Sequence, residues 1–112
     1  MPSNPAPSAS STEDCSIQRT LDVIGDRWTL LILRDVFRGV RRFSQIQHDL
    51  GIAKNLLTDR LVALVEAGVV EKIPYQDRPV RHEYRLTEKG RALSPALLAL
   101  MRWGDDWYSD DG

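Results

Sequence analysis

The side chains best suited to recognising another molecule are gathered at the start of one amphipathic segment, IAKNLLTDRLVALVEAGVVEKI, at residues 52–73. Its first half carries Lys54, Asn55, Thr58 and Asp59, whereas its second half is almost entirely Leu, Val and Ala. Asn pairs well with adenine, Lys with guanine or phosphate, and Thr with a phosphate or a thymine methyl group. One end of this segment therefore offers the chemistry of base recognition, and the other end that of a buried helix.

The helical periodicity of this segment separates two faces. Leu57, Leu61, Leu64 and Gly68 share one side of a helical wheel. The other side carries Asn55, Thr58, Asp59, Val62 and Glu66, and is polar only near the N-terminus. Such a helix can keep its C-terminal half in the domain and place its N-terminal half in a DNA major groove, as the second helix of a helix-turn-helix does. A surface helix whose polar end simply faces water would show the same pattern, so the neighbouring elements decide between the two.

Other reactive side chains are few. Cys15, His48 and His82 are scattered along the chain, no third group is positioned to orient a Cys–His pair, and one Cys with two His is too few for a metal site. The chain has no P-loop and no GxGxxG motif. We therefore expect no enzyme, no catalytic residue, no metal and no cofactor.

Two helices are expected before this segment. Residues 16–24 have helical apolar spacing and end at Gly25, and Asp26 is placed to cap a second helix, RWTLLILRDVFRG, which is apolar nearly all round and should be central to the core. In RRFSQIQHDLG, Ser44 and Gln47 form a capping-box pattern that starts a short helix, and Gly51 ends it. Two short helices joined by so tight a turn indicate a helix-turn-helix.

A β-hairpin should follow. VVEKIPYQ and VRHEYRLT read as strands joined by the turn residues QDRP, and Pro74 confines the first strand to an edge or to its own end. Arg78 and Arg81 lie at and beside the hairpin tip. Thr87 should cap a last helix, with a kink at Ser94-Pro95. We therefore predict an α+β, mainly α fold: a winged helix-turn-helix domain with additional N- and C-terminal helices.

Length and composition indicate one ordinary domain. The chain has 112 residues, 42% hydrophobic and 28% charged, with a net charge of -1 and one cysteine. We expect a disordered tail at 1–14, which lacks the features of a secretory signal, and a domain at 15–112. No apolar run is long enough for a membrane span, and the single cysteine fits a cytoplasmic protein. Five basic and two acidic residues between Arg38 and Arg60, with an acidic C-terminus, give the charge polarity of a nucleic-acid binder.

The last helix has more apolar surface than one docking face requires. Leu93, Ala96, Leu97, Leu100, Trp103 and Trp107 lie along one side, whereas Leu98 and Met101 lie off it. A second apolar surface on one helix favours contact with another subunit. The sequence therefore predicts a homodimer, although a helix buried wholly within one subunit is the alternative.

The chain resembles the HxlR-type winged helix-turn-helix transcriptional regulators of bacteria over about residues 15–107. The matching segments are, in order, CSIQRTLDVIGDRWTLLILRD, RRFSQIQ, GIAKNLLTDRLVALVEAGVVEK, RHEYRLTEKG and LMRWGDDW. The resemblance implies a homodimer that binds double-stranded DNA at a palindromic site. It implies these DNA-facing residues: Arg42, Ser44, Lys54, Asn55, Thr58, Arg60, Arg78 and Arg81. It places the dimer interface on the first and last helices, where our candidates are Ile17, Leu21, Leu97, Leu100, Met101, Trp103 and Trp107.

Three positions remain open after the resemblance. Arg60 flanks the leucine stripe, so it either contacts DNA or forms a structural ion pair. Ala53 stands where many members have Ser, and Ala cannot cap the recognition helix. Cys15 occupies the place of the sensing cysteine of some members and is the candidate redox sensor, but we favour a buried packing role because free Cys usually behaves as an inert hydrophobe.

The expected function is sequence-specific regulation of transcription by a homodimer, most simply repression, with a small molecule or electrophile as effector. The alternative is a winged-helix module that contacts only proteins. The basic hairpin and the polar cluster at residues 54, 55 and 58 favour DNA.

Overall fold

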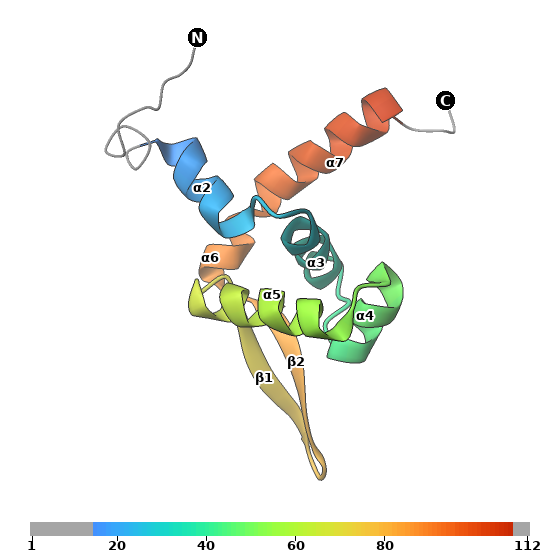
Figure 1. Cartoon of the computed structure of the whole chain (residues 1–112). Coiled ribbons are helices and arrows are strands. Elements are labelled where there is room, and N and C mark those ends of the chain that lie inside the picture. Colours follow the sequence, from blue (N-terminus) through green and yellow to red (C-terminus); the bar gives the residue numbers. More distant parts are fainter. Residues whose placement is uncertain (1–14, 109–112) are drawn as a thin grey trace.

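The computed structural model describes residues 15–108, so the predicted tail at 1–14 lies outside the described residues. The elements follow in the order α2 (Ser16–Ile24), α3 (Arg27–Phe37), α4 (Phe43–Leu50), α5 (Lys54–Glu66), β1 (Val70–Asp77), β2 (Val80–Leu86), α6 (Glu88–Arg91) and α7 (Ser94–Tyr108). Within residues 15–108 the fold is mainly helical with one two-stranded sheet (Figure 1). The predicted fold class, a winged helix-turn-helix, is confirmed.

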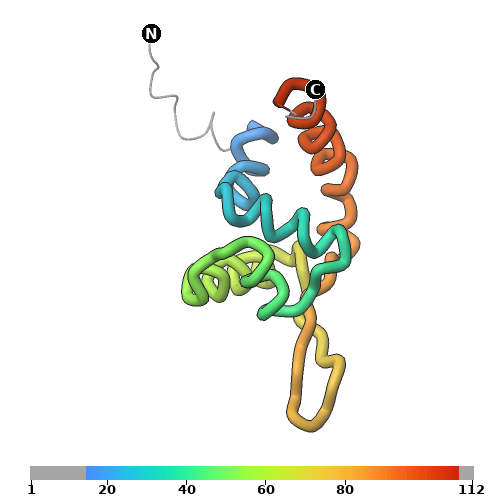
Figure 2. Tube along the Cα trace, turned by 90° about the vertical axis from the view of Figure 1, so that its right-hand side faces the viewer, coloured from blue at the N-terminus to red at the C-terminus, as the bar shows by residue number. Residues whose placement is uncertain are grey.

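The elements form a central body with projections on opposite sides. The β1–β2 hairpin extends from one side of the body, and α2 and α7 extend from the other side (Figures 1 and 2). The body itself consists of α3, α4, α5 and the base of the hairpin. This arrangement separates the predicted DNA-facing elements from the two helices predicted to form a dimer interface.

The core lies between α3 and α5, as the apolar patterns predict. Leu57, Leu61 and Leu64 of α5 are buried, and they form one cluster with apolar residues from α3 and α4. The α3 contribution consists of Ile32, Leu33 and Val36. Burial of each such side chain contributes about 1.5–3 kcal/mol, so the leucine stripe fixes which side of α5 faces outward.

Helix ends follow the sequence signals with one exception. The carboxylate of Asp26 accepts a hydrogen bond from the Thr29 backbone N–H at 3.1 Å, and Gly51 ends α4 in the left-handed conformation at φ 66°. The capping box was wrong: α4 begins at Phe43, and Ser44 lies inside the helix. Pairing of residues 41–42 with β2 explains the earlier start. The Tyr84 N–H donates to the Arg41 carbonyl at 2.7 Å, which holds the chain extended up to the helix.

The hairpin is antiparallel. Strand β1 includes Pro74, and its pairing with β2 continues on both sides of the proline. Pro74 faces His82, and the register becomes irregular between Pro74 and Gln76. Both strands of a two-stranded sheet are edges, which is why a proline is tolerated here. The turn contains Arg78 and Pro79, joined by a cis peptide bond.

The predicted kink in the last helix is a complete break between α6 and α7. Thr87 caps α6 as predicted, by accepting a hydrogen bond from the Gly90 N–H at 3.1 Å. Helix α6 then ends at Arg91, and α7 begins at Ser94, directly before Pro95. Proline suits a first helical turn, since it has no N–H to donate to the preceding turn.

Candidate nucleic-acid interface

The N-terminal half of α5 presents its polar side chains to solvent. Lys54, Asn55 and Thr58 are all exposed, whereas Leu57, Leu61 and Leu64 of the same helix are buried. The Thr58 hydroxyl donates to the Lys54 carbonyl at 3.0 Å, so its methyl group and the lone pairs of its oxygen are what it offers to a ligand. No side chain caps the helix at Ala53, as expected for alanine.

The C-terminal half of α5 is less buried than its composition suggests. Val62 is 51% exposed and Val65 is also exposed, because both lie on the outer side of the helix. The expectation that this half disappears into the core was therefore wrong for two of its valines. The polar and apolar halves of α5 thus share one outward face, and only the leucine side is buried.

A hollow of about 370 Å³ lies between the start of α4 and the hairpin. It brings together three of the predicted DNA-facing residues, Arg42, Ser44 and Arg81. The guanidinium carbon of Arg42 lies 4.2 Å from the centre of the Tyr75 ring, a cation–π contact that fixes the arginine against β1. Cations around a hollow of this kind can hold the phosphates of a nucleic-acid backbone.

The same hollow contains three residues that sequence reasoning missed: Lys72, Tyr75 and His82. Strand alternation would have found Lys72, which pairs with Tyr84 across the hairpin. The position of Tyr75 follows from the irregular register after Pro74, which alternation does not predict. The hollow therefore joins a helix and a hairpin that are separate in the sequence.

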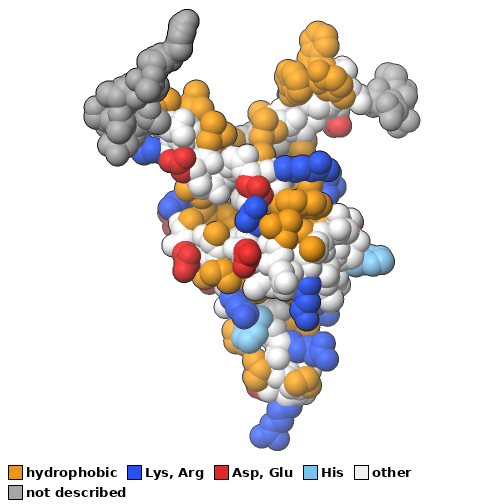
Figure 3. Space-filling model, in the orientation of Figure 1, with side chains coloured by type: hydrophobic (Ala, Val, Ile, Leu, Met, Phe, Trp, Pro, Cys, Tyr) orange, Lys and Arg blue, Asp and Glu red, His pale blue; other side chains and the backbone are white. Residues whose placement is uncertain are grey.

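The remaining predicted cation of the hairpin, Arg78, lies in the turn at the tip, exposed and far from α5 (Figures 1 and 3). Figure 3 shows basic side chains along the hairpin down to its tip. The helix-turn-helix surface and the hairpin thus offer two separate basic contacts. A duplex lying across both would contact bases through α5 and backbone through the hairpin.

Arg60 does not face outward with the other candidates. Its Nε lies 2.9 Å from Asp26 Oδ2, and its Nη2 lies 3.3 Å from Asp26 Oδ1. This paired contact lowers the pKa of Asp26 from its ordinary value, helped by the Thr29 N–H. Of the two interpretations left open, the structure shows the structural ion pair, which ties the start of α3 to α5.

A second charged cluster lies where α3 packs against α4. The Asp35 side chain is 1% exposed, and its Oδ2 has no hydrogen-bond partner among the described residues. Arg34 Nη2 lies 3.3 Å from Asp35 Oδ1 and 3.7 Å from Asp49 Oδ2. Burial and the neighbouring Asp49 carboxyl raise the pKa of Asp35 to about 6, against the opposing effect of Arg34. Sequence reasoning missed this cluster entirely.

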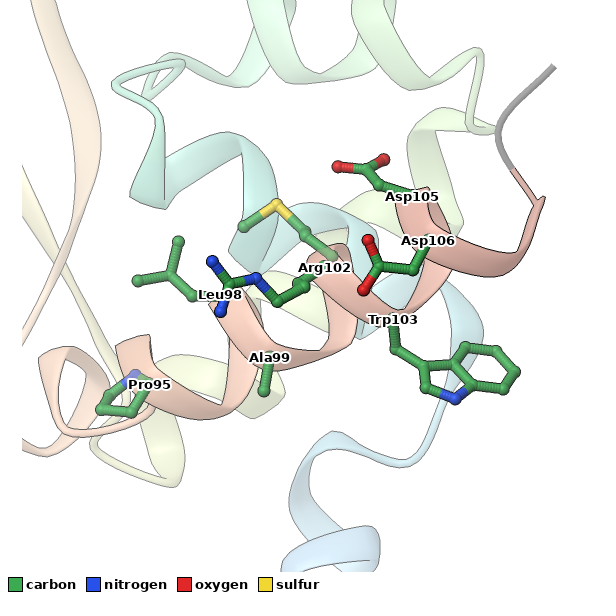
Figure 4. A pocket seen from close by; sticks show the side chains of 8 residues that line it. Pro95, Leu98, Ala99, Arg102, Trp103, Asp105 and Asp106 are labelled. Atoms are coloured by element: carbon green, nitrogen blue, oxygen red, sulfur yellow. The ribbon is translucent and has the colours of Figure 1, made fainter. Parts of the chain in front are cut away.

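The predicted interface residues of α2 and α7 fall into two groups. Five are exposed: Ile17, Leu21, Leu100, Trp103 and Trp107. The prediction that Leu97 lies in the dimer interface has to be corrected, because Leu97 is only 5% exposed and packs in the core of its own subunit. Met101 is partly buried against the same core. An open hollow of about 800 Å³ runs along α7 and is lined by Leu98, Arg102, Trp103 and Asp106 among others (Figure 4).

Cys15 precedes α2 at the N-cap position, and its thiol is free and exposed. The preferred packing role was therefore wrong within a single subunit, because the residue projects from the body rather than into its core. Among residues 15–108 there is no cluster of three or more His, Cys, Asp or Glu that could hold a metal ion.

Residues 23–111 match the profile of the HxlR-like helix-turn-helix family. The match runs from α3 to α7 and so includes every residue of the candidate nucleic-acid interface. The chain belongs to this family. Its relatives are named as HTH-type transcriptional regulators, and the family match is to a helix-turn-helix family rather than to an enzyme family. No helix in the described part of the chain has the length and apolar character needed to cross a bilayer.

Relatives and solved structures agree with this assignment. An HTH-type transcriptional regulator of Mycobacterium tuberculosis is 53% identical over 92 residues, covering 82% of this chain and 58% of the relative. The chain therefore spans about three fifths of that relative's length. The crystal structure of PA1607 superposes with a TM-score of 0.79 at 50% identity, over 85% of this chain and 66% of the other. The reduced form of the redox regulator HypR superposes with a TM-score of 0.76 at 33% identity, over 82% and 92% of the two chains.

Proposed function

We propose that this protein binds a palindromic operator as a homodimer and represses transcription by excluding the polymerase. In each subunit the N-terminal half of α5 enters a major groove, where Lys54, Asn55 and Thr58 contact base edges. The hairpin and the hollow at the start of α4 contact the phosphate backbone on either side. Membership of the HxlR-like family supports DNA as the partner.

The observation that carries this proposal is the exposed polar end of α5 together with the basic hollow between α4 and the hairpin. Lys54, Asn55 and Thr58 point to solvent although the opposite side of the same turns is buried. Arg42, Lys72 and Arg81 surround the hollow between α4 and the hairpin. A polar helix end that only faced water would not explain why three cations from outside α5 surround one hollow.

The exposed apolar side chains of α2 and α7 support the homodimer. Trp103 is 58% exposed, and Ile17 and Leu100 are exposed as well. Contiguous exposed apolar surface on a small domain marks an interaction site. Two bound subunits would read two half-sites about one helical turn apart.

Exposed Cys15 supports an electrophile or oxidant as one effector, since HypR is named as a redox regulator. The chain has no second cysteine, so oxidation by disulfide would join Cys15 of two subunits, and an electrophile would form an adduct. A covalent change next to α2 would alter the interface that spaces the two α5 helices. Replacing Cys15 by Ser should abolish any oxidant sensitivity of operator binding.

The proposal is tested by selecting bound DNA from a random pool with the purified protein. An inverted repeat should be enriched. On that repeat Asn55→Ala should relax base preference at one position of each half-site, by about 1–3 kcal/mol. Arg78→Ala should weaken all sequences alike and reduce the salt dependence. Absence of any enrichment would contradict the proposal.

A charge reversal distinguishes DNA binding from a module that contacts only proteins. Arg42→Glu places a negative charge in the basic hollow, so retention on DNA at low salt should fall sharply. Arg27→Glu is the matched control, because Arg27 is also exposed but lies at the start of α3, outside the hollow. If Arg42→Glu and the unchanged protein are retained equally, the protein-contact function becomes the better explanation.

A further inference from the structure

A separate hollow of about 240 Å³ lies between α2 and α6, at the opposite end of α5 from Lys54 and Asn55. Its walls are mostly apolar, formed by Val23, Ile24, Val69 and Leu93 together with Thr20. Two cations, Arg19 and Lys89, stand at its edge from opposite sides. The hollow shares no residue with the basic hollow between α4 and the hairpin.

We propose that this hollow binds a small organic anion: a carboxylate or similar group carried on a compact apolar body. The regulatory part of this inference rests on the proposed function, because it makes that anion an effector of operator binding. The binding itself stands on the geometry of the hollow and is tested without DNA.

One side of the hollow is rigid. Helix α6 packs so closely that a Cβ on Gly90 would lie 2.1 Å from the Val69 carbonyl oxygen. The Thr87 hydroxyl donates to the Gly68 carbonyl at 2.5 Å, and Lys89 Nζ donates to the Ala67 carbonyl at 2.7 Å. These contacts hold the Lys89 ammonium at the C-terminal end of α5, and Lys89 also lines the hollow.

The other side of the hollow is the loosely attached helix α2. Ile24, at its C-terminal end, is its only buried residue. Thr20 and Val23 of the preceding turns line the hollow, while Leu21 and Ile17 on the same helix are exposed. A ligand between α2 and α6 would therefore set the angle of α2 against the body. Since α2 belongs to the proposed dimer interface, that angle would also set the spacing of the two α5 helices.

Size and charge define the ligand class. A hollow of about 240 Å³ is smaller than the roughly 300–1,000 Å³ of drug-sized sites, so the body must be small, about ten heavy atoms. The apolar walls supply affinity, and the two cations select an anion over a neutral analogue of the same shape. Because the cations are exposed to water, the selection should be moderate, about fivefold to tenfold.

Benzoate and its neutral isostere benzamide are matched probes for this site. Methyl NMR on the full-length dimer should show saturable shifts at Val23, Val69 and Leu93 with benzoate, and binding about fivefold to tenfold weaker with benzamide. Lys89→Gln should remove most of that difference. No saturable shift at these methyl groups would overturn the proposal, and equal binding of both probes would overturn the anion class.

Two substitutions of equal exposure locate the site. Val23 and Val65 are each 38% exposed, but only Val23 lines the hollow. Val23→Phe should fill the hollow and abolish benzoate binding, whereas Val65→Phe should leave it unchanged. Because both positions are at the surface, both variants should fold, which far-ultraviolet circular dichroism would verify. Loss of binding in both, or in neither, would overturn the assignment.

A second copy of the chain is the competing occupant, because the aromatic and acidic end of α7 would also suit this hollow. In that case benzoate would fail to bind the dimer but would bind a monomeric variant such as Leu100→Glu, and this outcome would overturn the proposal. The regulatory step is read separately, as a benzoate-dependent change in affinity for the selected operator. Failure of the unliganded protein to bind any DNA would defeat the proposed function but leave the NMR result standing.

Discussion

The body of the molecule buries most of its apolar side chains within one subunit, whereas the projecting helices α2 and α7 leave most of theirs exposed. Helix α5 buries three leucines over 13 residues, but α7 buries only Leu97 over 15. Of the 11 large hydrophobic side chains that are exposed among residues 15–108, eight belong to α2 and α7. The body can therefore be stable by itself, and the projecting helices are left with apolar surface that water must cover.

This difference shows that one hydrophobic pattern can serve two purposes. In α5 a narrow apolar stripe is matched by α3 and α4, so the helix orients itself within one subunit. In α7 the apolar residues extend round the helix, and one subunit covers only Leu97 and part of Met101. Stability of the body should depend on its own packing, whereas order in α2 and α7 should depend on association. The following substitutions test that division.

The largest effect is expected in the body. Leu61→Ala removes a fully buried side chain from the core and should lower the free energy of unfolding by about 2–5 kcal/mol. Chemical denaturation at fixed protein concentration measures this change. Val62→Ala is the control, because the next residue faces water and should change the free energy by less than about 0.5 kcal/mol. Equal losses in both variants would mean that the body is not closed as described.

Association should respond to the projecting helices. Leu100→Glu places a charge on an α7 residue that is 54% exposed in one subunit, and should weaken dimerisation about 100-fold, or about 2.7 kcal/mol. Sedimentation equilibrium measures the dissociation constant. Val62→Glu is the control, since Val62 is about equally exposed but lies on α5. A Leu100→Glu protein that remains dimeric at the same concentrations would remove α7 from the interface.

The Asp35 cluster tests the body by pH. The pKa of Asp35 is about 6 in the folded protein against an ordinary value of 3.8, so its ionisation favours unfolding. Its contribution should therefore destabilise the fold progressively as the pH rises from about 4 to about 6. Asp35→Asn keeps a neutral side chain of the same shape and should be more stable than the unchanged protein at pH 7, by roughly 1–3 kcal/mol.

The comparison is made on the difference between the two proteins, because other carboxylates titrate in the same range. That difference in free energy of unfolding should be small below pH 4 and should grow up to about pH 6. Asp22→Asn is the control, since Asp22 is exposed on α2. A difference that does not vary with pH would show that Asp35 is ionised at the same pH in the folded and unfolded states.

Local signals in the sequence predicted much of this fold. The bounds of α2 and the caps at Asp26 and Thr87 follow from residue type and spacing alone. The capping box at Ser44 failed because a nonlocal contact, Tyr84 N–H to the Arg41 carbonyl, fixes where α4 begins. Caps formed by neighbours in sequence can be predicted, whereas a helix start fixed by another strand cannot.

The candidate site divides in the same way. Periodicity placed Asn55 and Thr58 on the side of α5 away from the leucines, and in the structure both residues are exposed, as is Lys54. It did not find Lys72 or Tyr75, whose place in the basic hollow depends on how the hairpin meets α4. Periodicity also does not identify the partner of Arg60, because Asp26 is 34 residues away in the sequence. Proposed base contacts come from one helix, whereas the phosphate contacts need the assembled fold.

The smallest effect concerns the Arg60–Asp26 pair, and it decides whether Arg60 belongs to the body or to the DNA-facing surface. Hydrogen bonding by Arg60 lowers the pKa of Asp26 below its ordinary 3.8, so the pair stabilises the fold above that pH, and this stabilisation is lost as the pH falls through the lowered pKa. Arg60→Gln should therefore cost about 1 kcal/mol or less at pH 7, since the pair is partly exposed, and progressively less below pH 4. Its base preference on the selected operator should match that of the unchanged protein, in contrast to Asn55→Ala. If Arg60→Gln instead relaxes base preference as Asn55→Ala does, the arginine leaves Asp26 for DNA in the complex.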